Sequence, residues 1–268
     1  MNQKKVVVIT GASSGIGLAL SREYACKDFA VVMAARSKDK LEKYANELSD
    51  KTLVLAVTTD VTKQEDCKRL IEKTIEKFGR IDILINNAGI SMRALFDDMD
   101  LMVMRHLMDV NFWGAVYCTQ YALPWLVKSE GTVVGVTSVA GIHGLPARSG
   151  YSASKFAMQG FLEAVRIENL HKNLHVLIIA PGFTASNVRK SALTANGLPQ
   201  GKSPRDESNM MSPEKVARKI YKAIRHRRRF IVLTTAGVTV NLVKKFWPAF
   251  LDRAFFKAMK NEPDSPLK

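Results

Sequence analysis

The chain has 268 residues, of which 47% are hydrophobic and 24% are charged. This composition can fill a hydrophobic core, and it excludes an intrinsically disordered chain. Basic residues outnumber acidic ones by 40 to 25, and residues 187–268 alone carry 18 basic and 6 acidic side chains. Such a block is typical of proteins that attract nucleic acid, an anionic membrane or an acidic ligand, and also of an ordinary solvated surface.

Short β-branched segments alternate with amphipathic segments along the chain. Strands are predicted at residues 5–10, 29–35, 52–57, 81–85, 131–138, 175–180 and 230–233. Helices are predicted at residues 16–27, 37–48, 63–78, 99–127 and 151–170. Apolar strands that are each followed by a helix indicate a parallel sheet covered on both faces. The sequence therefore predicts one α/β domain over residues 1–268, a doubly wound Rossmann-like parallel sheet of about seven strands with helices on both faces.

Two segments fall outside this alternation. Residues 187–212 have no periodicity, and a loop of that length predicts a substrate lid. Residues 241–268 form a basic and aromatic C-terminal extension, interrupted by Pro248. It suits an interfacial helix on an anionic membrane, and equally a segment that packs on a partner subunit or covers a substrate cleft.

The cysteine content and the N-terminal sequence indicate the cellular compartment. Cys26, Cys67 and Cys118 are far apart, and no CxxC or Cys/His cluster is present, so neither a disulfide framework nor a metal site is expected. The first residues lack the apolar core and cleavage site of a signal peptide. We expect a cytoplasmic protein, with membrane association left open.

A glycine-rich turn joins the first predicted strand to the first helix. Residues 10–17 read TGASSGIG, with glycines at Gly11, Gly15 and Gly17. Glycines let the backbone approach a pyrophosphate, and the N-terminus of the helix offers free N–H groups and a positive dipole end. Ser13 and Ser14 add hydroxyl donors. The context of strand, turn and helix favours a dinucleotide site over an ordinary turn.

A second group of polar residues is typical of acid–base chemistry. Ser138 ends the fifth predicted strand, and Tyr151 and Lys155 stand in YSASK near the start of a helix. Residues four apart share one helix face, so the phenol and the ammonium can act on one ligand. We expect the ammonium to lower the tyrosine pKa from its ordinary value of about 10.

Together, these motifs resemble the short-chain dehydrogenase/reductase family. The resemblance rests on TGxxxGxG, Asp60–Val61, NNAG at residues 86–89, Asn111, Ser138, YxxxK and Pro181–Gly182, in that order. The C-terminal third is similar to membrane-associated members that act on hydrophobic carbonyls. The resemblance implies an oxidoreductase that interconverts a ketone or aldehyde and an alcohol by hydride transfer. The alternative is a non-catalytic dinucleotide-binding module that senses redox state.

The resemblance also implies roles for individual residues. The catalytic set is Asn111, Ser138, Tyr151 and Lys155, with Tyr151 as general acid and base. The cofactor set is Gly11, Ser13, Ser14, Gly15, Ile16, Gly17, Arg36, Asp60, Val61, Asn87, Ala88, Gly89, Tyr151, Lys155, Pro181, Gly182, Thr184 and Ser186. The substrate set is Ser138, His143, Leu145, Tyr151 and Phe183, which suits a steroid, a lipid or a similar apolar molecule.

Arg36 bears on which dinucleotide binds. It follows the second predicted strand, where a carboxylate would bond the ribose 2′-hydroxyl of NAD(H). A guanidinium pairs instead with a 2′-phosphate, so NADP(H) is predicted over NAD(H). The family further implies a homodimer or homotetramer, and we expect no nucleic-acid partner because no motif of that kind is present.

Overall fold

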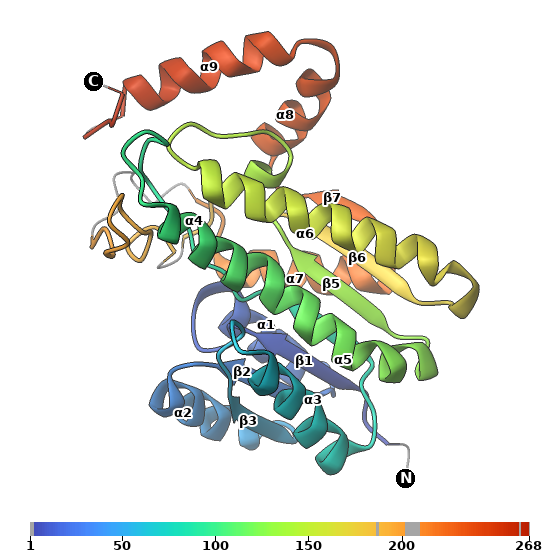
Figure 1. The fold of residues 1–268 in the computed structure, drawn as a ribbon. Helices are drawn as coiled ribbons and strands as arrows, with labels where there is room; N and C mark the ends of the chain where they lie inside the picture. The colour runs from blue at the N-terminus through green and yellow to red at the C-terminus, as the bar shows by residue number, and fades with distance from the viewer. Residues whose placement is uncertain (1–2, 186–187, 202–209, 263, 268) are drawn as a thin grey trace.

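The computed structural model describes residues 3–185, 188–201, 210–262 and 264–267. Within them, seven parallel strands form one sheet in the order β3-β2-β1-β4-β5-β6-β7. The strands are β1 (Val6–Thr10), β2 (Ala30–Ala35), β3 (Val54–Thr58), β4 (Ile83–Asn86), β5 (Thr132–Val136), β6 (His175–Ala180) and β7 (Phe230–Val232). The order reverses between β1 and β4, which confirms the predicted doubly wound sheet (Figure 1).

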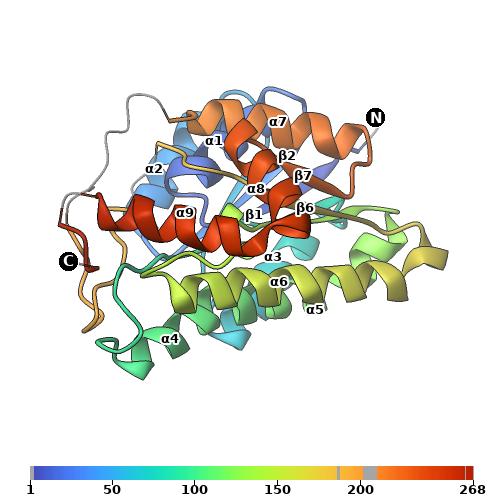
Figure 2. The same ribbon diagram turned by 90° about the horizontal axis from the view of Figure 1, so that it is seen from above.

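Helices cover both faces of the sheet, giving three layers (Figure 2). One face carries α1 (Gly15–Ala25), α2 (Lys38–Ser49) and α7 (Pro213–Arg225). The other face carries α3 (Gln64–Phe78), α5 (Gly114–Lys128) and α6 (Ser149–Glu168). Side chains alternate along each strand, so Val6 and Val8 enter one core while Val7 and Ile9 enter the other. This two-sided burial explains why the strands are apolar throughout.

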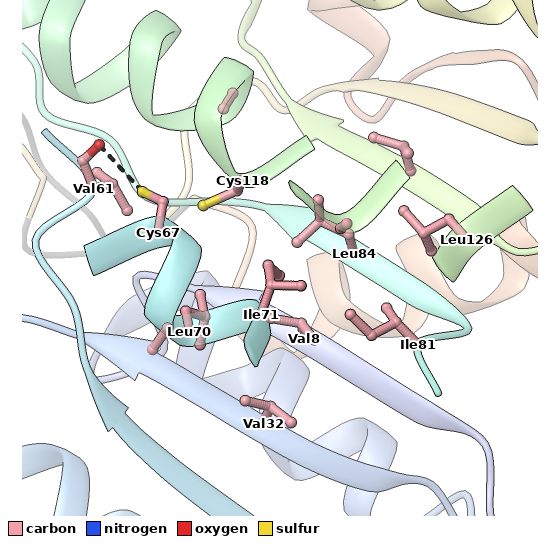
Figure 3. Close-up of a cluster of buried hydrophobic side chains, with 14 of the residues drawn as sticks. Val8, Val32, Val61, Cys67, Leu70, Ile71, Ile81, Leu84, Cys118 and Leu126 are labelled. Atoms are coloured by element: carbon pink, nitrogen blue, oxygen red, sulfur yellow. Dashed lines mark hydrogen bonds between the residues drawn. The ribbon is translucent and has the colours of Figure 1, made fainter. Parts of the chain in front are cut away.

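The core on the α3 and α5 face contains two of the cysteines. Figure 3 shows the sulfur of Cys118 pointing toward Cys67, whose own sulfur points toward the main-chain oxygen of Val61. Cys67 donates to the main-chain oxygen of Val61 at 3.6 Å, and both thiols are fully buried. Burial and the Cys67 contact raise the pKa of the Cys118 thiol well above its ordinary value. All three cysteines of the chain are free thiols.

The predicted helix at residues 99–127 is interrupted. It consists of α4 (Leu101–Met108), a π-helical turn (Asp109–Trp113) and α5, which contains Pro124. Single π turns inside α-helices often occur at functional sites. Here the turn holds Asn111, whose side chain bonds both the main-chain N–H and the main-chain oxygen of Ile90. The π-helical turn therefore lies where the Asn111 amide bonds the loop after β4.

Three helices in the C-terminal third complete the fold. α7 begins with Ser212 as its N-cap and Pro213 in the first turn. After β7 the chain forms α8 (Thr235–Phe246) and α9 (Pro248–Lys260), the outermost layer at one end of the molecule (Figure 1). Among the described residues, no helix combines the length and apolarity that a membrane crossing needs.

Candidate active site

A cavity of about 1490 Å³ runs along the carboxyl ends of all seven strands. This is the edge where doubly wound sheets bind their ligands. Its wall includes these predicted residues: Gly11, Ser13, Ser14, Gly15, Ile16, Arg36, Asp60, Val61, Asn87, Ala88, Gly89, Ser138, Leu145, Tyr151, Lys155, Pro181, Gly182, Phe183 and Thr184. The fold therefore brings these residues, which span 174 positions of the sequence, to the wall of one cavity.

The wall is strongly cationic. Seven lysine and arginine residues line it among the described residues, and Asp60 is the single acid. The Asp60 carboxylate accepts hydrogen bonds from the N–H and the hydroxyl of Thr62, at 3.1 and 2.8 Å. A cavity with this charge balance suits an anionic ligand.

The glycine-rich turn lies at the start of α1. Gly11 and Gly15 have φ angles of +66° and +51°, a conformation that favours glycine. A Cβ atom at Gly17 would lie 2.1 Å from the main-chain oxygen of Gly11, so the helix packs on the turn only through glycine. Ser14 is the N-cap and makes no side-chain capping bond. The first N–H groups of α1 are thus available to an anion in the cavity.

Hydrogen bonds fix the neighbouring strand end against this turn. The Thr10 hydroxyl accepts from the main-chain N–H groups of Asn87 and Ala88, both at 3.0 Å. The Asn87 amide in turn donates to the main-chain oxygen of Thr10 at 2.8 Å. The NNAG segment is therefore held at the point where the strand order reverses.

Two basic side chains stand together beyond the second strand. Arg36 follows β2, and Lys40 lies four residues later in α2. Both are exposed and both line the cavity. Arg36 precedes α2, Ser37 is the N-cap of that helix and Lys40 lies in its first turn, and all three residues line the cavity. Sequence reasoning identified Arg36 alone.

The Ser138 and Tyr151 hydroxyls meet on the opposite stretch of wall. Burial raises the pKa of Tyr151 above its ordinary value, and a hydrogen bond with Ser138 and the Arg148 charge oppose this rise. The expectation that the ammonium of Lys155 lowers this pKa is wrong for the structure, because desolvation outweighs every stabilising contact. The phenol is therefore a proton donor at neutral pH.

Lys155 lies beneath Tyr151 on the same face of α6. Its ammonium nitrogen donates to the main-chain oxygen of Val136 at 2.9 Å and lies 5.9 Å from the Tyr151 ring centroid. The side chain is 3% exposed, and burial lowers its pKa to about 8. Lys155 is thus poised to exchange a proton near neutral pH.

Asn111 lies behind the cavity rather than in its wall. It is fully buried, and its amide nitrogen donates to the Ser154 hydroxyl at 2.9 Å. A Cβ atom at Gly89 would lie 3.1 Å from the Asn111 oxygen and 3.2 Å from the Lys155 nitrogen. The Asn111 amide and the Lys155 ammonium therefore both lie next to Gly89, where there is no room for a larger side chain.

Three other predicted residues also differ in placement. Gly17 packs on the turn and does not line the cavity. His143 is buried away from the wall, with its Nε2 3.1 Å from Asp252 of α9 and its ring stacked on Phe255. Ser186 lies outside the described residues.

Several wall residues were missed by sequence reasoning. Arg148, three residues before Tyr151, donates to the Ser91 hydroxyl at 2.8 Å and to the main-chain oxygen of Met92 at 2.7 Å. Val240 of α8 and Phe255 of α9 also line the cavity. The proximity of Arg148 to YSASK was a signal in the sequence, whereas the contribution of the C-terminal helices depends on tertiary packing. No group of metal-binding side chains occurs in the part of the chain that the structure describes.

Known proteins resemble this chain in sequence and in fold. The sequence model of the short chain dehydrogenase family matches residues 5–197. An Arabidopsis thaliana protein named 11-beta-hydroxysteroid dehydrogenase-like 2 is 35% identical over 254 residues, which cover 92% of this chain and 79% of that protein. Zebrafish (Danio rerio) dehydrogenase/reductase SDR family member 7B is 33% identical over 260 residues, which cover 94% and 84%.

A third relative is more similar over a shorter stretch. Arabidopsis thaliana 11-beta-hydroxysteroid dehydrogenase 1A is 43% identical over 188 residues, or 69% of this chain and 53% of that protein. The chain therefore spans about half the length of that relative.

Solved structures show the same fold. An alcohol dehydrogenase of the archaeon Thermococcus sibiricus, complexed with 5-hydroxy-NADP, superposes with a TM-score of 0.75 at 27% identity, covering 86% of this chain and 96% of that one. A Burkholderia phymatum short chain dehydrogenase/reductase in complex with NAD gives a TM-score of 0.83 at 22% identity, covering 94% and 97%.

Proposed function

This chain belongs to the short-chain dehydrogenase family of oxidoreductases, and we propose that it interconverts a ketone or aldehyde and an alcohol with NADP(H) as hydride carrier. One observation carries the proposal. Ser138, Tyr151 and Lys155 line the same cavity as the glycine-rich turn and the NNAG segment. A pure sensor of dinucleotides needs no such proton-transfer group.

The cavity fits a nicotinamide dinucleotide in charge and in shape. The N–H groups at the start of α1 and the hydroxyls of Ser13 and Ser14 would hold the pyrophosphate. Asp60 and Val61 would hold the adenine, and Pro181, Gly182 and Thr184 would hold the carboxamide, since all of them line the cavity. When bound, the dinucleotide supplies or accepts the hydride.

Arg36 and Lys40 support a preference for NADP(H). Their charges lie beside the end of β2, and Asp60 is the single carboxylate among the described wall residues. A phosphate gains charge-assisted hydrogen bonds from both groups, whereas an uncharged ribose hydroxyl gains far less.

Tyr151 moves the proton. Its raised pKa keeps the phenol protonated, so it donates to the oxygen of a carbonyl as negative charge develops there. Ser138 bonds the same oxygen and holds the phenol in place. Lys155, with its pKa of about 8, would return a proton to Tyr151 and hold the nicotinamide ribose, and Asn111 would act through it as a positioning residue.

The cavity wall also carries apolar side chains. Among them are Leu145, Phe183, Leu193, Met211 and Phe255. Such a wall favours a steroid, a lipid or a similar hydrophobic carbonyl. The names of the hydroxysteroid dehydrogenase relatives agree with this class.

The remaining assignments follow from the same proposal. Residues 1–268 act as one catalytic domain, and residues 187–212 are a lid whose Val188 and Met210 reach the cavity. We propose a homodimer or homotetramer in the cytoplasm, without a nucleic-acid partner. The 241–268 extension covers part of the cavity through Phe255, which lines its wall.

The experiment is an NADPH and NADH oxidation assay against steroid, long-chain acyl and small aromatic carbonyls. The proposal expects turnover of an apolar carbonyl with NADPH, and a lower rate with NADH. Equal rates with both dinucleotides would contradict the role of Arg36 and Lys40. Binding of dinucleotide without turnover of any carbonyl would favour a sensing module instead.

A further inference from the structure

The helices α8 and α9, here called the C-terminal helix pair, expose an unusual group of aromatic side chains. Phe246, Trp247 and Phe250 lie where the two helices meet, and they are 71%, 66% and 64% exposed. The rings of Phe246 and Trp247 are 6.0 Å apart between centroids. We call these three residues the aromatic corner. Large apolar side chains that gather on a surface mark a site of contact with another molecule or a membrane.

Inward contacts hold the helix pair on the body of the protein. Lys244 donates to the main-chain oxygen of Ile142 and lies 4.7 Å above the Phe156 ring centroid. Asp252 pairs with His143 at 3.1 Å. The buried pair of Glu262 and Arg93, with an N···O distance of 3.1 Å, fastens the segment that follows α9. The helix pair is therefore anchored at several points, and its outer surface has a fixed shape.

The charged side chains of the helix pair are mostly basic. Asp252 is the single acid within residues 235–260, and its carboxylate lies 3.1 Å from His143 Nε2. Lys245, Arg253, Lys257 and Lys260 are all exposed on the helices that carry the aromatic corner. The helix pair thus combines exposed aromatic rings with a net positive charge, four exposed cations against one acid.

We propose that the C-terminal helix pair docks this protein on the surface of an anionic lipid membrane. The aromatic corner enters the interface between lipid headgroups and acyl chains, where tryptophan and phenylalanine side chains are stable. The four cations lie against lipid phosphates and carboxylates. The charge complementarity and the exposed rings together favour this occupant over a second copy of the chain, whose matching surface would be equally cationic.

Docking would bring the cavity close to the bilayer. The role of this placement in substrate entry rests on the proposed function. Val240 and Phe255 of the same helices line the cavity wall. A docked helix pair therefore lies between the bilayer and the cavity. An apolar substrate dissolved in the bilayer then has a short path to Ser138 and Tyr151.

The test is sedimentation of the full-length protein with vesicles of phosphatidylcholine alone, and with about 30 mol % phosphatidylserine added. We expect binding to the anionic vesicles at low salt, and a loss of at least about tenfold at 0.5 M salt, because screening removes the ionic attraction. Bromine-labelled lipid should quench the fluorescence of the wild-type protein, and Trp247→Phe should abolish most of that quenching. Absence of wild-type binding to anionic vesicles overturns the proposal.

Three variants separate the contributions. Phe246→Ser/Trp247→Ser/Phe250→Ser should weaken vesicle binding by about tenfold or more, since each ring contributes apolar area. Lys245→Gln/Arg253→Gln/Lys257→Gln should remove most of the salt dependence. The matched control, Ile167→Ser/Leu170→Ser, changes side chains of similar exposure in the last turn of α6 and in the 3-10 turn after it, and should bind as the wild type does.

Two further readouts keep the test independent of folding and of catalysis. All substituted side chains are exposed, so circular dichroism and the thermal midpoint should match those of the wild type. Analytical ultracentrifugation of each variant reports self-association. If the aromatic variant loses self-association while vesicle binding is unchanged, a second copy covers the aromatic corner and the proposal is wrong. None of these measurements depends on turnover, so failure of the proposed function leaves them interpretable.

Discussion

The ammonium nitrogen of Lys155 donates to the main-chain oxygen of Val136 at 2.9 Å, in a site where the lysine side chain is 3% exposed. Burial lowers the pKa of this ammonium to about 8, so burying the charge has a cost that the hydrogen bond to Val136 does not offset. The protein thus holds an ammonium under Tyr151 at the expense of folding stability. A site that keeps such a strained charge beside a phenol is organised for proton transfer.

Lys155 should make stability depend on pH. Its pKa is about 8 in the folded protein against an ordinary 10.5, so the unfolded chain binds more protons between these values and stability rises with pH there. The penalty is greatest below pH 8. Between pH 7 and pH 9.5, the unfolding free energy of the wild type minus that of Lys155→Met should increase by about 2 kcal/mol.

Urea denaturation of both proteins across this pH range measures the difference. A difference that stays flat would mean that the ammonium is not desolvated. The comparison cancels the titration of all other groups, provided that the variant retains the wild-type circular dichroism spectrum.

Arg148 should lower the pKa of the Tyr151 phenol. It lines the cavity three residues before Tyr151, and its charge opposes the effect of burial on the phenol pKa. In the alcohol-oxidation direction the rate follows the phenolate, so Arg148→Gln should shift the rise of kcat toward higher pH by about one unit. Arg148→Lys preserves the charge and should retain the wild-type profile. If both variants lower kcat with an unchanged pH profile, Arg148 only holds Ser91 and Met92 in place.

Arg36 and Lys40 should determine the choice of dinucleotide. Replacing both with serine removes two cations from the cavity wall, and kcat/KM with NADPH should fall by about 100-fold while the value with NADH changes little. Lys43→Ser is the control, because Lys43 is exposed on the same helix and lies outside the cavity. An equal loss with both dinucleotides would place these side chains in general binding rather than in discrimination.

Much of the fold was predictable because its signals are local. Strands buried on both faces read as apolar runs, and the helices between them show helical spacing, so the parallel sheet followed directly. The end of a helix was predicted at Arg225, but the start of α7 was not, although Ser212, Pro213 and Glu214 form a helix start and Val216, Ala217 and Ile220 lie on one buried face.

The site was predictable where strand ends bring motifs together, and less so where packing decides. Arg36 could be identified from its place after a strand, but Lys40 required the turn of α2 to bring it to the same wall. His143 follows Ser138 by five residues, yet Asp252 and Phe255 of the distant α9 hold it away from the cavity. The rise in the Tyr151 pKa depends on the desolvation of the folded cavity, which no spacing of residues reports.

The most direct measurement compares the wild type with Tyr151→Phe, using NADPH and the best carbonyl substrate. Turnover should fall by about 1000-fold or more because the proton donor is lost, while the dissociation constant for NADPH, measured by its fluorescence, should stay within about threefold. Turnover by Tyr151→Phe at a rate near that of the wild type would contradict the account. So would a wild-type protein that binds NADPH and reduces no carbonyl.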